Sequence, residues 1–380
     1  MDVMQDSTEV SIDIEQVLCI FEEVTVISGT SLNERLVADF ITEFTKDFPF
    51  MLFEDKAGER TGGNSGNLIF VPHSYQASMP TTAFFAHMDT VRDTGTTFPE
   101  RTGDRIISQN NAQLGADNRL GLALLLWFME YLNKSEHQPN IVFVFTIAEE
   151  IGLLGAKELD LSPWSVSQAF VLDSALRPGK FISNCSGCSI FEARFNGKAA
   201  HSAVTNGAGV HAISMAAEAT SAILAHPTPE AIRRNIGKIK GGQATNIIPD
   251  SCTIDGEVRG NSNRDIGAML SQYKKICEDS AQKHGGTVLW RDYADFEPYM
   301  ISEKSPHRML LERAMLEAGL VPEGVTYSGG SDANVLNAKG IEAINLGIGA
   351  QNPHSDDEFV LFEDIRSMMK LLLSINHNLR

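Results

Sequence analysis

The sequence contains little cysteine, and no run of apolar residues is long. Five cysteines in 380 residues are too few, and odd in number, for a disulfide framework, which favours a reducing compartment. Apolar stretches such as 120–128 and 141–147 are much shorter than the roughly 20 residues needed to cross a bilayer. The polar, acidic residues 1–9 lack the basic flank and apolar segment of a secretory signal. We therefore expect a soluble, cytoplasmic protein with no membrane partner.

Basic residues are also in the minority. The 31 lysines and arginines are outnumbered by 49 aspartates and glutamates, which gives a formal net charge of -18. A surface of this sign repels phosphate backbones and anionic membranes, so nucleic acid is not an expected partner. Most of these acidic residues serve solubility, and the remainder are expected to be clustered carboxylates that hold cations.

The first half of the chain has the pattern of an α/β layer fold. Apolar, β-branched and aromatic runs predict buried strands, and a leucine- and alanine-rich run predicts a helix between two of them. This order predicts a largely parallel mixed sheet flanked by helices. Ser31 and Glu34 have the spacing of a capping box, which predicts a helix start. The expected strands are 67–71, 82–86, 141–147 and 169–172, and the expected helix is 119–132.

A different order of elements follows Cys188. The pattern is strand, helix, strand, strand, helix, strand, which is the order of a ferredoxin-like α+β unit. These elements are predicted at 189–195, 208–224, 235–239, 252–258, 265–283 and 287–291. Helix and strand signals then resume at 308–317, 342–346 and 362–376. The simplest architecture is a catalytic domain, 1–183 and 297–380, interrupted by a lid or dimerisation domain, 184–296.

Histidine and carboxylate side chains gather in short segments after predicted strands. Such residues follow three successive strand-like runs, at His87, Glu149 and Asp173. A single histidine in this place is more often structural, but ligands of an open α/β sheet bind beyond the carboxyl ends of its strands. Imidazole and carboxylate suit zinc and related divalent ions. The set therefore predicts one shared cluster. Its segments are His87-Met-Asp89, Gly115-Ala-Asp117-Asn118, Glu149-Glu150, Asp173 and His354-Ser-Asp-Asp-Glu358.

Through these segments, the chain resembles the M20 metallopeptidases over nearly its whole length. His87-Met-Asp89, Gly-Ala-Asp117-Asn118-Arg-Leu-Gly, Ala-Glu149-Glu150-Ile-Gly-Leu-Leu-Gly-Ala and Asp173 occur in that family's order, and His354 completes the set. The Gly-Ala-Asp-Asn form, the stretch Gly329-Gly330-Ser331-Asp332 and the ending His-Ser-Asp-Asp-Glu-Phe are similar to the peptidase T-like branch.

The resemblance implies a site for two divalent metal ions. Asp117 would bridge them, His87 and Asp173 would complete one site, and Glu150 and His354 the other. A bridging carboxylate can hold two cations about 3.5–4 Å apart, and their shared water loses a proton near neutral pH. The ions are expected to be zinc, with cobalt and manganese as alternatives.

Two further acidic residues have implied roles beside the ions. Glu149, left free of metal, would be the general base that takes the proton from the water and delivers it to the leaving amine. Asp89 lies two residues after His87 on the same strand face, and would accept the imidazole's other N–H.

In the inserted domain, three residues match positions that M20 enzymes use on substrate: His201, Asn246 and Arg259. His201 is usually supplied by the partner subunit, which implies a homodimer through the lid. Arginine can bind both oxygens of a carboxylate, although an ordinary ion pair is the simpler interpretation of Arg259. Cys185 and Cys188 have redox-pair spacing, but without a second pair they are interpreted as structural thiols.

The predicted reaction is aminopeptidase action on short peptides, with tripeptides as the expected substrates. In the resemblance, aspartate at position 173 is typical of aminopeptidase-type members and glutamate of carboxypeptidase-type members. Three alternatives remain. One is an N-acyl amino acid deacylase or carboxypeptidase-like amidohydrolase of the M20 family, and another is a catalytically silent metal-binding interaction protein. The third is an M42 aminopeptidase, in which the inserted domain would precede the His-x-Asp segment rather than follow Asp173.

Overall fold

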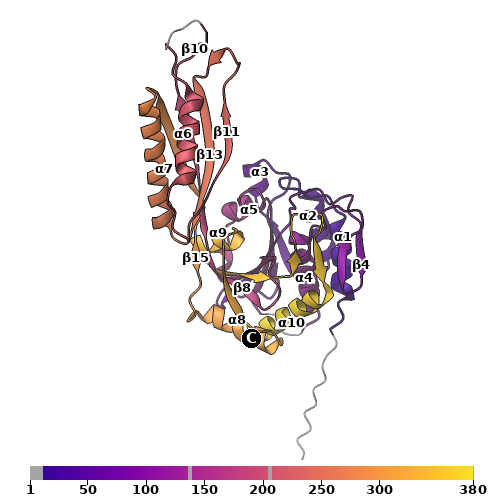
Figure 1. Cartoon of the computed structure of the whole chain (residues 1–380). Helices are drawn as coiled ribbons and strands as arrows, with labels where there is room; N and C mark the ends of the chain where they lie inside the picture. The colour runs from indigo at the N-terminus through magenta and orange to yellow at the C-terminus, as the bar shows by residue number, and fades with distance from the viewer. Residues whose placement is uncertain (1–11, 136–138, 204–207, 380) are drawn as a thin grey trace, which may run out of the picture. The chain divides into compact units, whose positions relative to one another are not determined.

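The structure is a computed structural model that describes residues 12–135, 139–203 and 208–379, and it divides into two compact units (Figure 1). Unit 1 comprises Met1–Ser183, Ile301–Val325 and Ser331–Arg380, and unit 2 comprises Asn184–Met300 and Thr326–Gly330. Unit 2 thus includes residues 297–300 and 326–330, which the sequence assigned to the first domain. The polar residues 1–9 lie outside the described residues.

Unit 1 is built on a mixed sheet whose centre is parallel. Four strands lie side by side in the order β6 (Ile141–Thr146), β3 (Thr81–His87), β7 (Val166–Ser174) and β17 (Glu342–Gly347), and each neighbouring pair is parallel. Every residue of β3 and β6 is buried, as expected for strands covered on both faces. The predicted fold class, a largely parallel mixed sheet flanked by helices, is confirmed.

Antiparallel strands extend this sheet on both sides. On one side β2 (Leu68–Pro72) pairs with β6, and β1 (Phe50–Glu54) forms the edge. On the other, β8 (Lys180–Cys185) pairs with β17, and β15 (Tyr299–Met300) and β16 (Glu323–Tyr327) pair with β8. The four parallel strands are therefore the central strands of the sheet, and their carboxyl ends lie side by side along one edge of it.

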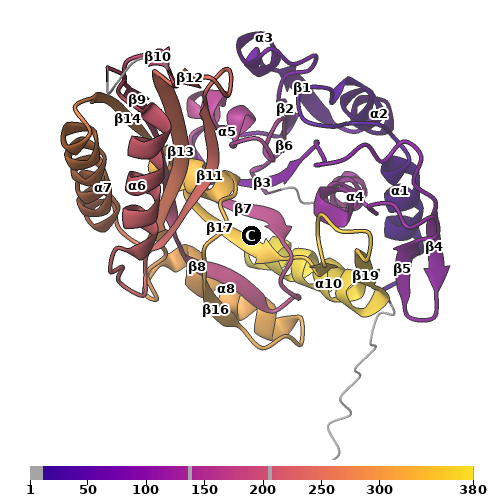
Figure 2. The same cartoon turned by 45° about the horizontal axis from the view of Figure 1, so that its top comes forward.

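The longest described helix of unit 1 packs against both the central sheet and three other helices. α4 (Ala116–Asn133) packs against β3 and β7, while α1 (Glu15–Thr25), α2 (Arg35–Thr45) and α10 (Phe362–Asn378) pack against α4 (Figure 2). Fourteen of the 18 residues of α4 are buried, which explains its apolar sequence. The remaining helices are α3 (Ala57–Thr61), α5 (Leu154–Glu158), η1 (Ser162–Trp164), α8 (Pro306–Glu317) and α9 (Asp332–Ala338).

A small antiparallel sheet, which the sequence did not predict, completes unit 1. Its order is β18 (Ala350–Gln351), β19 (Phe359–Leu361), β5 (Arg105–Ser108) and β4 (Pro99–Thr102). β18 and β19 form a hairpin, so residues 352–358 are the loop at its end. This loop carries His354 on a base that is fixed by strand pairing.

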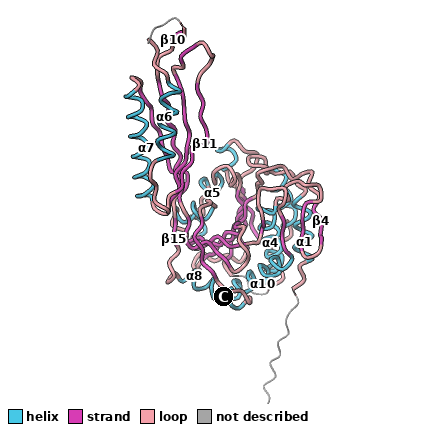
Figure 3. Tube along the Cα trace, in the orientation of Figure 1, coloured by secondary structure: helices cyan, strands magenta, loops and turns pink. Residues whose placement is uncertain are grey.

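Unit 2 has the predicted ferredoxin-like order of elements. The strands β9 (Gly187–Asn196), β11 (Arg233–Gly241), β13 (Ser251–Gly260) and β14 (Thr287–Phe296) form an antiparallel sheet in the order β11-β13-β9-β14. α6 (Ala212–Ala225) and α7 (Asn263–Lys283) pack against it through one apolar core, and Figure 3 shows both helices beside the strands. The short strands β10 (Ala200–His201) and β12 (Ile247–Ile248) pair with each other.

The helix start predicted from Ser31 and Glu34 is confirmed, but the capping box itself does not form. α2 begins at Arg35, and neither residue caps it with a side-chain hydrogen bond. The Ser31 hydroxyl instead donates to Asp89 at 2.6 Å, and the buried Glu34 carboxylate accepts the backbone N–H groups of Leu32 and Ala148. Both side chains therefore make hydrogen bonds to residues distant in sequence and do not cap the helix.

Among the described helices, none combines the length and the apolar character that a membrane span requires.

Candidate active site

The ends of two parallel strands and the start of α4 bring the first group of predicted ligands together. His87 is the last residue of β3 and Asp173 lies near the end of β7, while Asp117 lies in the first turn of α4. The Nε2 atom of His87 is 3.1 Å from Asp117 Oδ1 and 3.1 Å from Asp173 Oδ1. One imidazole nitrogen therefore faces two carboxylate oxygens.

A second group repeats this arrangement around the other oxygen of Asp117. His354 Nε2 is 3.2 Å from Asp117 Oδ2 and 2.9 Å from Glu150 Oε1. One ligand-type atom each from His87, Asp117 and Glu150 lies within 4.8 Å of the other two. Asp117 thus turns one oxygen toward each histidine and lies between the two groups.

The chemistry of these side chains fits two divalent cations. An imidazole nitrogen carries at most one hydrogen, so it cannot donate fully to two carboxylates at once. A metal ion between the nitrogen and the oxygens would use all of these lone pairs, and nitrogen and carboxylate oxygen are both ordinary zinc ligands. One ion would take His87, Asp173 and one oxygen of Asp117, and the other would take His354, Glu150 and the remaining oxygen.

Burial and mutual contact strongly perturb these groups. Burial raises the pKa of Asp173, and it also raises the pKa of Glu150. Burial alone would raise the pKa of Asp117, but hydrogen bonds from His354 and His87 hold it well below its usual range. Hydrogen bonds to Asp117 and Glu150 raise the pKa of His354 to about 10. Because these carboxylates repel one another in a partly desolvated site, positive charge is needed there.

Glu149 lies beside this cluster without belonging to either group of ligand contacts. Its side chain is buried, and this burial, together with repulsion from Asp173, raises the pKa of Glu149 well above its ordinary value. Divalent cations nearby would lower it again, because they stabilise the charged form. A carboxylate held in this way suits proton transfer near neutral pH.

Two buried carboxylates hold the backbone of the turn that carries both glutamates. Glu34 Oε1 accepts the N–H of Ala148 at 2.9 Å, and Asp89 accepts the N–H groups of Glu149 at 3.0 Å and Glu150 at 3.2 Å. Ala148 has φ 49°, a left-handed conformation that is unfavourable for alanine. The turn is therefore maintained by tertiary hydrogen bonds, and the role of Glu34 in it was missed from the sequence.

The prediction that Asp89 lies on the same strand face as His87 is wrong. β3 ends at His87, so Asp89 does not share a strand face with it. His87 Nδ1 lies 3.0 Å from the backbone oxygen of Asp89 and 3.3 Å from its Oδ1. Asp89 thus reaches the imidazole through its backbone as well as its carboxylate, and it also orients Glu149 and Glu150.

A buried arginine, which the sequence analysis did not single out, lies behind the site. Arg119 is fully buried in α4 and donates to the backbone oxygens of Met88 at 2.5 Å and Ile27 at 3.1 Å. Burial lowers the pKa of Arg119 to about 10, while the charges of Asp89 and Glu34 oppose that change. The guanidinium therefore balances part of the buried negative charge and fixes the carbonyl between His87 and Asp89.

Known proteins are similar to this chain in both sequence and fold. Residues 186–285 match the M20 peptidase dimerisation domain, and residues 100–180 match the M42 glutamyl aminopeptidases. The aminopeptidase PepT of Bacillus cereus is 28% identical, covers 97% of this chain and 99% of its own, and superposes with a TM-score of 0.87. A tripeptidase of Staphylococcus aureus is 26% identical with the same coverage and a TM-score of 0.89.

The chain is an M20 peptidase of the peptidase T-like branch. The uncharacterized protein YqjE of Bacillus subtilis is also similar, with 28% identity over 93% of this chain and 96% of its own. The M42 match covers only the segment from β4 to β8, which includes Asp117, Glu149, Glu150 and Asp173. The dimerisation domain follows Asp173, and the M20 neighbours match nearly the full length, so the M42 alternative is not supported.

The three substrate residues predicted for this peptidase lie in unit 2. His201 ends β10 and Asn246 precedes β12, and the N–H of Ser202 donates to the Asn246 backbone oxygen at 3.0 Å, so the two exposed side chains belong to one small turn region. Arg259 lies on β13 in a two-pronged ion pair with Glu257, at 3.1 Å for both contacts, and donates to the Ser328 backbone oxygen at 2.9 Å. Their action on substrate stays a prediction.

None of the five cysteines, all of which lie within the described residues, forms a disulfide. Cys185 and Cys188 are both buried, and burial raises the pKa of Cys188 to about 12. A thiol with such a pKa stays protonated and is a poor nucleophile or metal ligand. This supports the structural interpretation of the pair.

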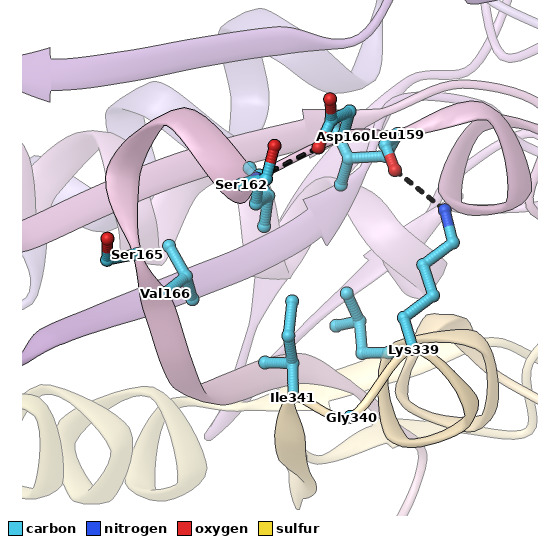
Figure 4. Close-up of a pocket in the computed structure, with 10 residues that line it drawn as sticks. Leu159, Asp160, Ser162, Ser165, Val166, Lys339, Gly340 and Ile341 are labelled. Atoms are coloured by element: carbon cyan, nitrogen blue, oxygen red, sulfur yellow. Dashed lines mark hydrogen bonds between the residues drawn. The ribbon is translucent and has the colours of Figure 1, made fainter.

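A surface cavity of about 450 Å³ lies elsewhere on unit 1, between the segment after α5 and the end of α9 (Figure 4). Lys339 extends along it and donates to the backbone oxygens of Ala156, Lys157 and Leu159 at 2.6–2.8 Å. This ammonium caps the carboxyl end of α5. The described residues that line the cavity include none of the predicted ligands, so the cavity takes no part in the chemistry below.

Proposed function

We propose that this M20 peptidase is a two-metal aminopeptidase that hydrolyses short peptides, with tripeptides as its preferred substrates. The observation that carries the proposal is the position of Asp117, whose two oxygens face the Nε2 atoms of His87 at 3.1 Å and His354 at 3.2 Å. Asp173 and Glu150 complete the two groups. Asp117 would therefore contribute one oxygen to each of two ions, which we expect to be zinc.

The protein side chains have separate tasks in the proposed reaction. When bound, two divalent ions would supply an acidic water and polarise the peptide carbonyl. Glu149 accepts the proton of the attacking water and later donates it to the nitrogen of the leaving amine, so the carboxylate is regenerated in each turnover. Asp89 holds the backbone that carries Glu149 and Glu150, because its carboxylate accepts both of their N–H groups.

The contacts of Arg259 leave room for a substrate carboxylate. A guanidinium has five N–H donors, of which Glu257 takes one on Nε and one on Nη2, and Ser328 takes one on Nη1. The remaining two donors, one on each terminal nitrogen, match the two oxygens of a peptide C-terminus. A free N-terminal amine would be attracted by the buried carboxylates around the ions.

A homodimer is part of the proposal. Its support is the match of residues 186–285 to a peptidase dimerisation domain, and it would bring His201 to the active site of the partner subunit. There the imidazole could donate to the developing oxyanion. The cytoplasmic location expected from the sequence stays a prediction.

The proposed function is tested by metal counting and a substrate panel. We expect two ions per chain after reconstitution with zinc, and cleavage of tri-Ala to Ala and di-Ala. Asp117→Ala should lose more metal than any other single ligand change, because Asp117 contributes to both sites. Full activity with one ion per chain would refute the two-metal mechanism.

The panel also separates the proposal from its alternatives. N-acetylation of tri-Ala should abolish cleavage, because the free amine is lost. C-terminal amidation should raise KM, and Arg259→Ala should raise it to the same extent without further loss on the amidated peptide. Faster hydrolysis of N-acetyl-Ala than of tri-Ala would identify a deacylase instead. No hydrolysis of any substrate by the metal-loaded protein would favour the silent metal-binding protein.

A further inference from the structure

The loop that carries His354 also contributes a carboxylate, that of Glu358, which contacts the backbone around Asp117. Glu358 is 1% exposed and lies at the base of this loop, directly before β19. Its Oε2 accepts the backbone N–H of Gly115 at 2.7 Å, and its Oε1 accepts the backbone N–H of Asp117 at 3.1 Å. Both oxygens of a buried carboxylate are therefore used on the turn that presents Asp117.

This turn needs acceptors from outside itself. The first N–H groups of a helix have no partner within the helix, and here the first turn is also irregular. Gly115 has φ 73°, in the left-handed region, and Asp117 has φ -88° and ψ 99°, which are not helical values. A Cβ at Gly115 would lie 2.7 Å from Thr94 Cγ2, so only glycine fits. The Glu358 side chain supplies these acceptors for the N–H groups of Gly115 and Asp117.

The same loop contacts Asp117 a second time through His354. Strand pairing fixes the ends of the loop, since Ala350 pairs with Val360, Gln351 pairs with Phe359, and β19 pairs with β5. Within it His354 has φ 64°, and its ring reaches Asp117 Oδ2 at 3.2 Å. Glu358 thus ties the loop to the Asp117 backbone, four residues from the point where His354 meets the Asp117 side chain.

We propose that Glu358 is a positioning residue that sets the distance between His354 and Asp117, and thereby completes one of the two metal sites. This inference rests on the two-metal site proposed above. His354, Glu150 and Asp117 form the site that depends on the loop, whereas His87 and Asp173 lie at the ends of β3 and β7 and need no contact with it. Loss of the Glu358 contacts should therefore affect the two sites unequally.

The test compares Glu358→Gln with Asp357→Asn. Glutamine keeps the shape, but it offers one acceptor and sets an NH2 group against a backbone N–H. Asp357→Asn removes the same charge from an exposed position one residue earlier in the loop. Titration of the metal-free proteins with Zn²⁺ should give two tight ions for wild type and Asp357→Asn. In Glu358→Gln one ion should keep its affinity and the other should bind about 10–100-fold more weakly, as is usual for the loss of a residue that orients a ligand.

Two further readouts keep a folding defect apart from a positioning effect. Metal-free Glu358→Gln should unfold cooperatively, and Glu358→Asp, which keeps the charge on a shorter side chain, should recover part of the lost affinity. A crystal structure of Glu358→Gln should show His354 Nε2 farther from Asp117 Oδ2 than 3.2 Å. Wild-type affinities at both sites, equal weakening of both, or an unchanged distance would overturn the role of Glu358. If wild type itself binds fewer than two ions, the two-metal proposal fails, and the distance alone then decides the role of Glu358.

Discussion

Glu149→Gln separates the chemistry of this peptidase from its metal binding. The substitution removes the proton acceptor but keeps the size of the side chain and the backbone N–H that Asp89 holds at 3.0 Å. Loss of a general base lowers turnover by about 10²–10⁴-fold, which corresponds to about 3–5 kcal/mol in the activation free energy. We therefore expect turnover of tri-Ala to fall by this factor while two ions per chain remain.

The structure also predicts the effect on stability. Burial and the neighbouring Asp173 raise the pKa of Glu149 well above its ordinary value, so its charge opposes folding of the metal-free chain as pH rises through the folded pKa. Glutamine carries no charge. The midpoint of thermal unfolding of metal-free Glu149→Gln at pH 7.5 should therefore equal or exceed that of wild type.

The matched control is Glu150→Gln at the adjacent position. Glu150 Oε1 lies 2.9 Å from His354 Nε2, so this variant should lose affinity for one ion. The assays are turnover of tri-Ala, elemental analysis after dialysis, and thermal unfolding of both variants. Turnover of Glu149→Gln within tenfold of wild type would refute its role as the base. Retention of both ions by Glu150→Gln with loss by Glu149→Gln would show that the two roles are exchanged.

Three other predictions concern stability, pH and assembly. Arg119→Met removes a fully buried cation and should lower the free energy of unfolding in urea by about 3–5 kcal/mol. The control Arg92→Met, at an exposed ion pair, should lower it by less than about 1 kcal/mol. Equal losses would contradict the role of the buried guanidinium. Burial raises the pKa of Glu358 from 4.5 to about 7, so its stabilising contribution is present below pH 4.5 and is lost as pH rises through about 7. Metal-free wild type should therefore lose up to about 2 kcal/mol more than Glu358→Gln between pH 5 and pH 7.5 in urea unfolding, and parallel curves would contradict this. Mixed inactive His201→Ala and Glu149→Gln protomers should regain partial activity as hybrid dimers, whereas a fully active monomer at low concentration would rule out the shared site.

Most elements of the fold could be predicted because their signals are local. Residues 141–147 form a continuous apolar run, and β6 is buried at every position, so the sequence pattern matches a strand covered on both faces. β13 alternates between half-buried and buried residues along its whole length, as expected when helices cover one face of a sheet. The ferredoxin-like order of unit 2 followed from such patterns.

Elements whose partners are distant in sequence could not be predicted. β18 and β19 have two and three residues, and they form strands because Phe359 pairs with Ile107 in β5. The spacing of Ser31 and Glu34 suits a capping box. In the folded chain, however, the Ser31 hydroxyl donates to Asp89 and the Glu34 carboxylate accepts the N–H of Ala148. A local motif is a weak guide wherever a buried donor or acceptor elsewhere needs the same side chain.

The sequence by itself determined which residues could carry the chemistry, because His87, Asp117, Glu149, Asp173 and His354 stand in motifs whose side-chain types and order are typical of one family. Only the tertiary structure decided how their atoms meet, with one oxygen of Asp117 toward each histidine.

The supporting carboxylates could not be predicted for the same physical reason. Glu358 accepts the N–H of Gly115 across 243 positions of sequence, and Glu34 accepts that of Ala148 across 114. Buried N–H groups in irregular turns must find an acceptor, and the folded chain, not the local sequence, determines which carboxylate lies within reach.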